Sequence, residues 1–282
     1  MTLTVDIVQN ERDTWLTLYL DAAVMRLVDA HCHLHDKMFD RDRDDVVERA
    51  SKSDVVFMIT SSLSRTDASK VLEIKTKYPS TVGVCIGSDP LNLNMKDVKR
   101  IRAFARKHKN TILGIGEVGL DYYWVRENEH RETQIRLFRE WIRFAEELHL
   151  PLIVHSRSAG KYAVKILLES RFKRILMHAY DGRTGWAIKA TEEGLRFSIP
   201  TSVWYSKQKQ KLVKALPLNS LLVETDAPVL SPIRGNRNEP ANLIYAIRKI
   251  AELKEVSDNE VAETTTRNAE ELFQIPNRIP QG

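Results

Sequence analysis

Asp29-Ala30-His31-Cys32-His33 directly follows Met25-Arg26-Leu27-Val28, a segment short and apolar enough to form a buried strand. Side chains alternate between the two faces of a strand, so His31 and His33 point the same way, about 7 Å apart. Two imidazoles on one face at the end of a strand can bind one metal ion. The alternative is a loop that contains two histidines by chance, and the rest of the sequence decides between these interpretations.

Strand and helix patterns alternate from Met25 onward, as in an α/β fold. Eight strands, each followed by a helix, predict a (β/α)8 TIM barrel. A doubly wound open sheet is the alternative, but the first loop lacks the Gly-rich phosphate fingerprint of its dinucleotide-binding version. The expected strands lie at 25–31, 54–61, 81–87, 111–117, 151–155, 174–178, 194–199 and 220–225. The expected helices lie near 42–52, 64–78, 95–109, 129–149, 159–170, 184–193, 206–215, 239–254 and 257–273.

Two of these helices have especially clear signals. In 129–149, apolar residues recur at helical spacing with charged residues between them. They are Ile135, Phe138, Trp141, Ile142, Ala145 and Leu148. Near the end of the chain, Ser257 and Glu260 read as a capping box, which predicts the start of the last helix.

Composition places the chain among ordinary globular enzymes. It has 282 residues, of which 43% are hydrophobic and 29% charged, and no apolar run approaches the roughly 20 residues of a membrane helix. A formal charge of +5 permits a polyanionic substrate without requiring one. The two cysteines, Cys32 and Cys85, fall in expected strands and do not support a disulfide framework. We therefore expect a reduced, cytoplasmic location.

The chain divides into one domain with two short ends. Met25 begins a complete first strand, so we expect residues 1–24 to be a non-essential extension without catalytic chemistry. The acidic and interrupted character of this extension excludes a secretory signal. Residues 25–275 form the expected barrel domain, and residues 276–282 form a tail.

Residues of metal-ligand type occur where the expected strands end. Four more such residues join the first histidine pair, one each from the fourth, fifth, sixth and eighth strands. The complete set is His31, His33, Glu117, His155, His178 and Asp226. In a barrel the C-terminal ends of all strands meet at one face, so we expect a single metal site there. The remaining histidines fall outside this pattern and are interpreted as structural or solvated; they are His35, His108, His130 and His149.

With these motifs in this order, the sequence resembles the TatD-related metal-dependent nucleases of the amidohydrolase superfamily. The resemblance extends over roughly residues 25 to 275 and departs from the family pattern after His178, where Ala179-Tyr180-Asp181-Gly182 replaces a common Cys-Phe-Ser-Gly. The matching stretches are Asp29-Ala30-His31-Cys32-His33-Leu34, Gly116-Glu117-Val118-Gly119-Leu120-Asp121-Tyr122, Pro151-Leu152-Ile153-Val154-His155-Ser156-Arg157, Glu224-Thr225-Asp226-Ala227-Pro228 and Arg237-Asn238-Glu239-Pro240.

The resemblance implies a barrel of the metal-dependent hydrolase type with two divalent ions, Mg²⁺, Mn²⁺ or Zn²⁺. His31, His33 and Asp226 would hold one ion, and His155 with His178 would hold the second. Glu117 would bridge the two, because a carboxylate can bind two cations whereas an imidazole binds one. Two ions sharing a water can activate it for attack on phosphorus. Asp226 would accept the proton of that water, so the expected catalytic residues are Asp226 and Glu117.

The substrate is inferred from the residues that follow the ligands. Arg157 follows the fifth strand, and Arg234, Arg237 and Asn238 follow the eighth, so we expect them to contact phosphate. Tyr122 is an expected contact to an unpaired base, with hydrophobic covering of the barrel mouth as the alternative. Tyr123, Trp124, Tyr180, Trp204 and Tyr205 could stack on bases or simply cover the barrel mouth.

Three functions remain open at this point. The resemblance implies a deoxyribonuclease that trims single-stranded DNA ends in the 3′ to 5′ direction. The same barrel could instead hydrolyse a small amide, lactone or aminoacyl ester. A non-catalytic scaffold that binds nucleic acid through a relict metal site is the third, and it ranks last because all six ligand positions are filled. The sequence predicts no membrane partner and leaves the oligomeric state open.

Overall fold

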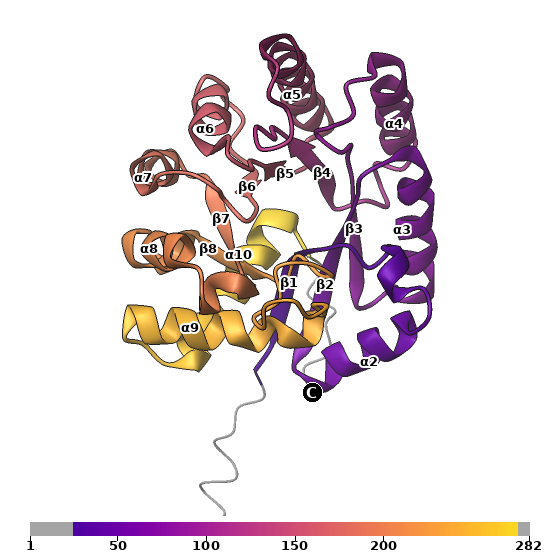
Figure 1. Cartoon of the computed structure of the whole chain (residues 1–282). Coiled ribbons are helices and arrows are strands. Elements are labelled where there is room, and N and C mark those ends of the chain that lie inside the picture. The colour runs from indigo at the N-terminus through magenta and orange to yellow at the C-terminus, as the bar shows by residue number, and fades with distance from the viewer. Residues whose placement is uncertain (1–24, 276–282) are drawn as a thin grey trace, which may run out of the picture.

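A computed structural model describes residues 25–275, and it confirms the (β/α)8 barrel. All eight strands are parallel and are hydrogen-bonded in chain order from β1 to β8. Figure 1 shows the helices as a ring outside them. The strands are β1 (Leu27–Cys32), β2 (Val55–Ser62), β3 (Val82–Ile86), β4 (Gly114–Gly119), β5 (Leu152–His155), β6 (Ile175–Met177), β7 (Arg196–Pro200) and β8 (Leu221–Glu224). The extension and the tail lie outside the described residues, so their expected roles stay predictions.

The helices follow the predicted alternation, with one difference near the end. The expected helix at 239–254 is divided into a 3-10 turn, η4 (Pro240–Leu243), and α9 (Ile244–Lys254). The other helices are α2 (Arg43–Lys52), α3 (Arg65–Lys77), α4 (Met95–Lys107), α5 (Asn128–Leu148), α6 (Gly160–Leu168), α7 (Thr184–Glu192), α8 (Lys207–Ala215) and α10 (Asp258–Phe273). The remaining 3-10 turns are η1 (Lys37–Phe39), η2 (Thr201–Trp204) and η3 (Leu218–Ser220). The predicted cap at Ser257 is present, since its side chain accepts the N–H of Glu260.

The barrel closes between β8 and β1 just beyond the end of β8. The N–H of Asp226 donates to the carbonyl of His31 at 2.9 Å, and the N–H of His33 donates to the carbonyl of Ala227 at 2.8 Å. The carboxylate of Asp29 accepts the N–H of Thr225 at 2.9 Å and reinforces the same seam. The closure therefore places the ligands of the first and last strands side by side.

Strand β4 lies two to three residues further along the chain than predicted. It runs from Gly114 to Gly119, so Glu117 lies inside the strand and not at its end. Gly119 adopts a φ of +149°, and a Cβ there would lie 2.1 Å from the carbonyl oxygen of His155. Only glycine permits this close approach of β4 to β5, which brings Glu117 and His155 together.

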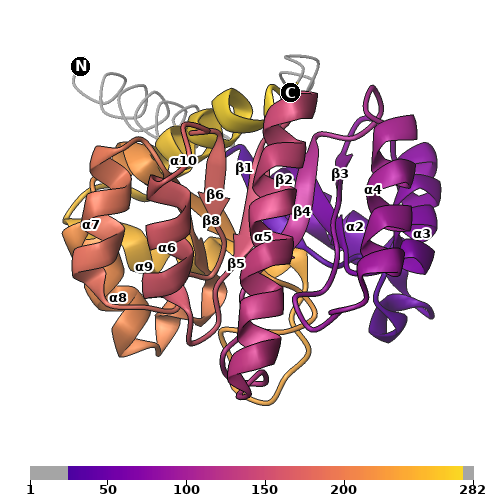
Figure 2. The same ribbon diagram turned by 90° about the horizontal axis from the view of Figure 1, so that it is seen from above.

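The last helix, α10, closes the end of the barrel at which the strands begin. Ala269, Leu272 and Phe273 of this helix pack against barrel-interior residues such as Val28 and Leu222. Figure 2 views the barrel from the side and shows α10 across one end. The interior is therefore sealed at the N-terminal ends of the strands, and access remains at their C-terminal ends.

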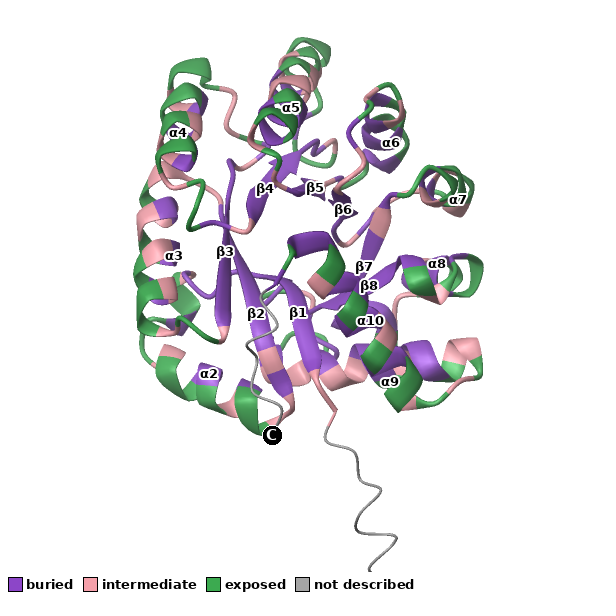
Figure 3. Cartoon of the chain, turned by 180° about the vertical axis from the view of Figure 1, so that it is seen from behind, coloured by how far each residue is buried: buried purple, intermediate pink, exposed green. Residues whose placement is uncertain are grey.

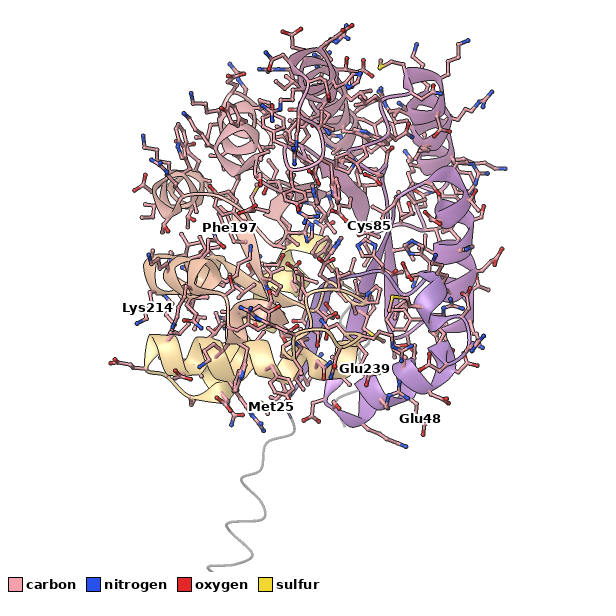
Figure 4. All side chains as sticks on the ribbon, in the orientation of Figure 1. Met25, Glu48, Cys85, Phe197, Lys214 and Glu239 are labelled. Carbon is pink, nitrogen blue, oxygen red and sulfur yellow. The ribbon has the colours of Figure 1, made fainter. Side chains whose placement is uncertain are left out.

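The core lies on both sides of the strands. Figure 3 shows strands that are almost entirely buried and helices that are exposed on their outward faces. In Figure 4, Cys85 and Phe197 lie inside the ring of helices, whereas Glu48 and Lys214 lie at its outer edge. Both cysteines are buried and free, as the composition predicted.

Candidate metal centre

The structure brings all six predicted ligands together at the C-terminal ends of the strands. Five strands contribute: β1 and the residues after it supply two imidazoles, and β4, β5, β6 and β8 supply one side chain each. The cluster forms three overlapping groups in which the ligand atoms lie within 4.8 Å of one another: His31 with His33 and Glu117, His31 with His178 and Asp226, and Glu117 with His155 and His178. All six side chains are buried or nearly so.

Glu117 occupies the middle of the cluster, and its two oxygens face different imidazole pairs. Oε2 lies 3.2 Å from His31 Nε2 and 3.3 Å from His33 Nε2. Oε1 lies 2.6 Å from His155 Nδ1 and 3.0 Å from His178 Nε2. A carboxylate in this position can bridge two cations held by the two pairs.

The first imidazole pair is completed by Asp226. Its Oδ1 lies 3.5 Å from His31 Nε2 and 3.4 Å from His33 Nε2, and these two nitrogens are 3.2 Å apart. Nitrogen and oxygen atoms from three side chains thus converge on one point. Buried polar atoms converging in this way suit a cation, because a cation satisfies several lone pairs at once.

Buried polar groups orient the imidazoles from behind. Ser61 Oγ lies 3.2 Å from His31 Nδ1, and Asp121 Oδ2 lies 3.1 Å from His155 Nε2. Glu224 Oε2 lies 3.5 Å from His178 Nδ1. Such partners fix the ring orientation and tautomer of metal-binding histidines. Sequence reasoning missed these roles, although Asp121 and Glu224 belong to the quoted motifs and a carboxylate inside an apolar stretch was the available signal.

The pKa values follow from this dense arrangement. Burial alone would raise the pKa of Glu117, but the charge of His178 and hydrogen bonds with His155 and His178 hold it well below its usual range. Burial opposes protonation of His155, yet hydrogen bonds with Asp121 and Glu117 raise its pKa to about 9. Burial acts the same way on His33, and hydrogen bonds with the two carboxylates raise its pKa to about 10. A metal ion binds neutral imidazole, so metal binding releases protons and strengthens as pH rises.

A pocket of about 630 Å³ opens directly above the cluster. Five of the six ligands line it, together with residues from most of the surrounding loops. Its wall includes Arg157, Lys209 and three exposed apolar side chains, Leu91, Trp124 and Val229. The pocket therefore combines a polar floor with an apolar rim, as ligand sites commonly do.

Of the predicted substrate contacts, Arg157 reaches the pocket most directly. It is exposed, and its guanidinium lies over the ring of Tyr123, 4.1 Å from the centroid. Tyr122 is half-buried against Tyr162 and packs on the hydrophobic core. Trp124 is the aromatic residue of this loop that lines the pocket, whereas Tyr122 is not among the lining residues, so a base contact of Tyr122 stays a prediction.

The predicted contacts after β8 have protein partners. Arg234 is exposed and lies over the ring of Tyr205, 4.3 Å from the centroid. Arg237 donates to both carboxylate oxygens of Asp42 at 2.8 and 2.6 Å. Asn238 is fully buried, and its amide donates to backbone carbonyls of Thr225 and Val229. The structure therefore corrects the expectation for Asn238, which holds the loop instead of facing the pocket.

Three further side chains are buried in the structure, and one of them was not singled out in the sequence. His35 is buried in the pocket wall, 3.8 Å from Asp67, so the solvated interpretation is excluded and the structural one is kept. Tyr180 is fully buried against Phe197 in the core. Lys209 was missed: its buried ammonium donates to the carbonyls of residues 179 and 180 at 2.7 and 2.6 Å, and burial lowers its pKa to about 8.

No helix among residues 25–275 has the length and apolar character needed to cross a membrane.

Comparisons with known proteins agree with this geometry. The family model described as TatD related DNase matches residues 28–274. The human protein named deoxyribonuclease TATDN3 is 40% identical over 263 residues, covering 89% of this chain and 96% of that protein. An uncharacterized metal-dependent hydrolase of Methanocaldococcus jannaschii is 35% identical, covering 88% of this chain and 97% of that protein. The crystal structure of YjjV, a TatD homologue from Escherichia coli K12, has the same fold with a TM-score of 0.83 at 24% identity, covering 90% of this chain and all of that one. The match spans nearly the whole described domain, and the chain belongs to the TatD-related DNase family.

Proposed function

We propose that this protein is a metal-dependent deoxyribonuclease that hydrolyses phosphodiester bonds, acting from the 3′ ends of single strands. The observation that carries the proposal is the position of Glu117, with one carboxylate oxygen toward each imidazole pair. Family membership supports the substrate class, since the human relative is named a deoxyribonuclease. The pocket above the cluster supports attack at a phosphate that enters from the barrel mouth.

The residues present suit a centre of two divalent ions. His31, His33 and Asp226 would hold one ion, while His155 and His178 would hold the other. Imidazole ligands favour Zn²⁺, the two carboxylates also suit Mn²⁺, and Mg²⁺ prefers a shell of oxygen ligands. When bound, such ions supply an activated water and stabilise charge on phosphoryl oxygens.

The chain's own groups perform the remaining steps. Asp226 lines the pocket and can accept the proton of the attacking water as the new P–O bond forms. The P–O bond to the leaving nucleotide breaks in the same step, and the departing oxygen takes up a proton, either the one that Asp226 accepted or one from solvent. Arg157 can donate two parallel hydrogen bonds to phosphate oxygens. Trp124, which is 60% exposed, offers a face for the unpaired terminal base.

Arg234 and Arg237 are kept as further candidate phosphate contacts. Arg234 is exposed beside Tyr205, where it can reach an incoming strand without breaking an ion pair among the described residues. Arg237 reaches phosphate only by leaving Asp42, so we expect its contribution to be the smaller one. The buried, free cysteines fit a reducing environment, and we propose the cytoplasm as the location.

The test uses purified protein, DNA labelled at either end, and Mg²⁺, Mn²⁺ or Zn²⁺ with a chelator control. We expect cleavage of single strands with Mn²⁺ or Zn²⁺, loss of activity with chelator, and stepwise loss of nucleotides from the 3′ end. A duplex of the same sequence and an RNA strand measure selectivity. Hydrolysis of a small amide or lactone with no cleavage of DNA would overturn the proposal.

A further inference from the structure

Lys209 is a buried cation in the wall of the pocket above the metal cluster. Its side chain belongs to α8, is 8% exposed and lines this pocket. Lys207 and Lys211 of the same helix are exposed, and no other lysine or arginine among residues 25–275 is buried. Lysine is rarely buried without a partner, so the position of this ammonium needs a physical reason.

The hydrogen bonds of Lys209 leave one donor of its ammonium free. An ammonium carries three N–H donors. Two of them are used by the carbonyls of Ala179 and Tyr180, which lie 2.7 and 2.6 Å from Nζ. The third has no acceptor among residues 25–275. Because the side chain lines the pocket, a molecule that enters the pocket can supply this acceptor.

The charge of Lys209 is also incompletely compensated. It forms no ion pair within the described part of the chain, and Asp181, Glu224 and Asp226 act on it only over longer distances. Asp181 instead accepts the N–H of Ser158 at 2.7 Å, and Glu224 accepts the N–H of residue 179 at 2.7 Å. Burial therefore outweighs the three carboxylates and lowers the pKa of Lys209. A buried charge of this kind is stabilised by an anion at contact distance.

The neighbouring Gln208 shows that holding this loop does not require a charge. Its amide donates to the carbonyls of Tyr180 and Gly182 at 3.3 and 3.0 Å. A neutral amide costs less to bury than an ammonium and can satisfy the same kind of carbonyl. The two hydrogen bonds of Lys209 to the loop thus explain its position but not its charge.

The metal centre makes an anion beside Lys209 more favourable still. Divalent ions held by Asp226 and the other ligands would add positive charge to the same pocket. Arg157, the other cation named in the pocket wall, is exposed, whereas Lys209 is shielded from water. Attraction between opposite charges is stronger where water is excluded.

We propose that Lys209 binds a non-bridging oxygen of the substrate phosphate in this pocket, through the donor that the protein leaves free. This inference rests on the proposed function, because it takes the phosphodiester to enter the pocket above the metal centre. Negative charge that builds up on the phosphoryl oxygens as water attacks would strengthen the contact. Lys209 therefore contributes both to binding of the phosphate and to turnover.

The test compares two neutral variants of Lys209 with a matched control. K209M removes the charge and keeps an unbranched chain, and K209Q also keeps N–H donors for the loop carbonyls. Q208A is the control, because it removes hydrogen bonds to the same loop at a residue that does not line the pocket. For each metal-loaded protein, calorimetry gives the Kd of deoxyadenosine 5′-monophosphate and of deoxyadenosine. Metal content, melting temperature and kcat/KM on single-stranded DNA are measured in parallel.

We expect both neutral variants to bind the nucleotide at least about tenfold more weakly than the parent, because a hydrogen bond to a charged group is lost. Binding of the nucleoside should stay within about twofold, since it carries no phosphate. Their kcat/KM should fall at least about tenfold with unchanged metal content. Q208A should keep both Kd values within about twofold, even where its melting temperature falls as K209M's does. K209Q provides the measurement if K209M does not fold.

Three outcomes would overturn the phosphate contact. Equal weakening of nucleotide binding in Q208A would assign the effect to the loop. Unchanged nucleotide binding in both neutral variants would exclude the contact, and loss of their metal would make Lys209 a support of the metal centre instead. In each case a parent that cleaves DNA keeps the proposed function. A parent that binds the nucleotide but cleaves no DNA would overturn the proposed function and leave the contact standing.

Discussion

Glu117 joins the two halves of the candidate centre through its two carboxylate oxygens. Replacing Glu117 with Gln keeps the shape and removes the charge that balances two cations. We expect metal occupancy to fall and turnover to drop by at least about a hundredfold, in line with other losses of metal-site support. Metal analysis and initial rates measure both effects. Glu48→Gln, at the outer surface, is the control, and near-normal turnover of Glu117→Gln at saturating metal would exclude bridging.

Substitution of Asp121 tests whether the side chains that contact the metal-binding imidazoles orient them. Its Oδ1 accepts the N–H groups of Tyr123 and Trp124, while Oδ2 faces His155 Nε2. In Asp121→Asn the amide NH₂ would face the imidazole if the oxygen kept its backbone contacts. We expect metal affinity to fall about 10- to 100-fold while the melting temperature without metal stays close to the parent's. Calorimetric titration measures the affinity, and an unchanged value would show that Asp121 does not orient His155.

At the scale of single residues, the six clustered ligands could be predicted because barrel topology brings strand ends together. The residues that support these ligands could not be predicted, because the role of Ser61 or Glu224 depends on which way a buried side chain points. The predicted phosphate contact of Asn238 was wrong for a related reason. An asparagine in a loop can face solvent or satisfy backbone carbonyls, and only the packed loop shows which it does.

The loops after β1 and β8 are joined by a bidentate ion pair between Asp42 and Arg237. The hydrogen bonds from Arg237 lower the pKa of Asp42 to about 2. A carboxylate with a lowered folded pKa stabilises the protein above its unfolded pKa of about 3.9 and loses that effect as pH falls toward 2. A double-mutant cycle of Asp42→Asn and Arg237→Met should give a coupling of about 0.5–1 kcal/mol at pH 7.

The pH dependence supplies the control for this cycle. Urea unfolding at pH 7 and pH 5 should give the same coupling, and the coupling should shrink at pH 3. A coupling that persists unchanged at low pH would show that the two side chains interact without the charge of Asp42, and not through an ion pair.

At the scale of elements, strand and helix order could be read from periodicity, but some bounds could not. The predicted strand at 111–117 included the apolar pattern at 111–113 and ended at Glu117, so it contained Gly116 but not Gly119. In the structure these glycines are part of β4, because close packing against β5 requires them. Similarly, the sequence at 239–254 carries helical periodicity throughout, and the η4 turn arises from the loop geometry around Asn238.

The whole barrel is complete within residues 25–275. We therefore expect a chain that begins at Met25 to fold, bind metal and keep the activity of the full chain. Circular dichroism, metal content and nuclease rates of the two proteins provide the comparison. Insolubility of the shorter chain, or loss of its metal, would show that residues 1–24 contribute to the fold.

At the scale of the molecule, the fold class followed from eight strand–helix units. The position of α10 across the end of the barrel did not follow from these units, because a C-terminal amphipathic helix could equally pack among the helices around the strands. Its destination is decided by long-range contacts: Arg196 and Arg174 donate to carbonyls of α10, and Asn268 donates to the carbonyl of Leu221. These partners lie far away in sequence, where periodicity gives no information.

The seal has a consequence for synthesis of the protein. Thr266 of α10 donates to the carbonyl of Arg26, a contact between residues separated by 240 positions. At translation rates of about 5–20 residues per second, β1 waits on the order of 10–50 s before α10 is made. Throughout that time the nascent chain on the ribosome exposes the apolar side chains that α10 covers in the folded protein. Chaperone demand should therefore be greatest during translation, and the finished enzyme should need little.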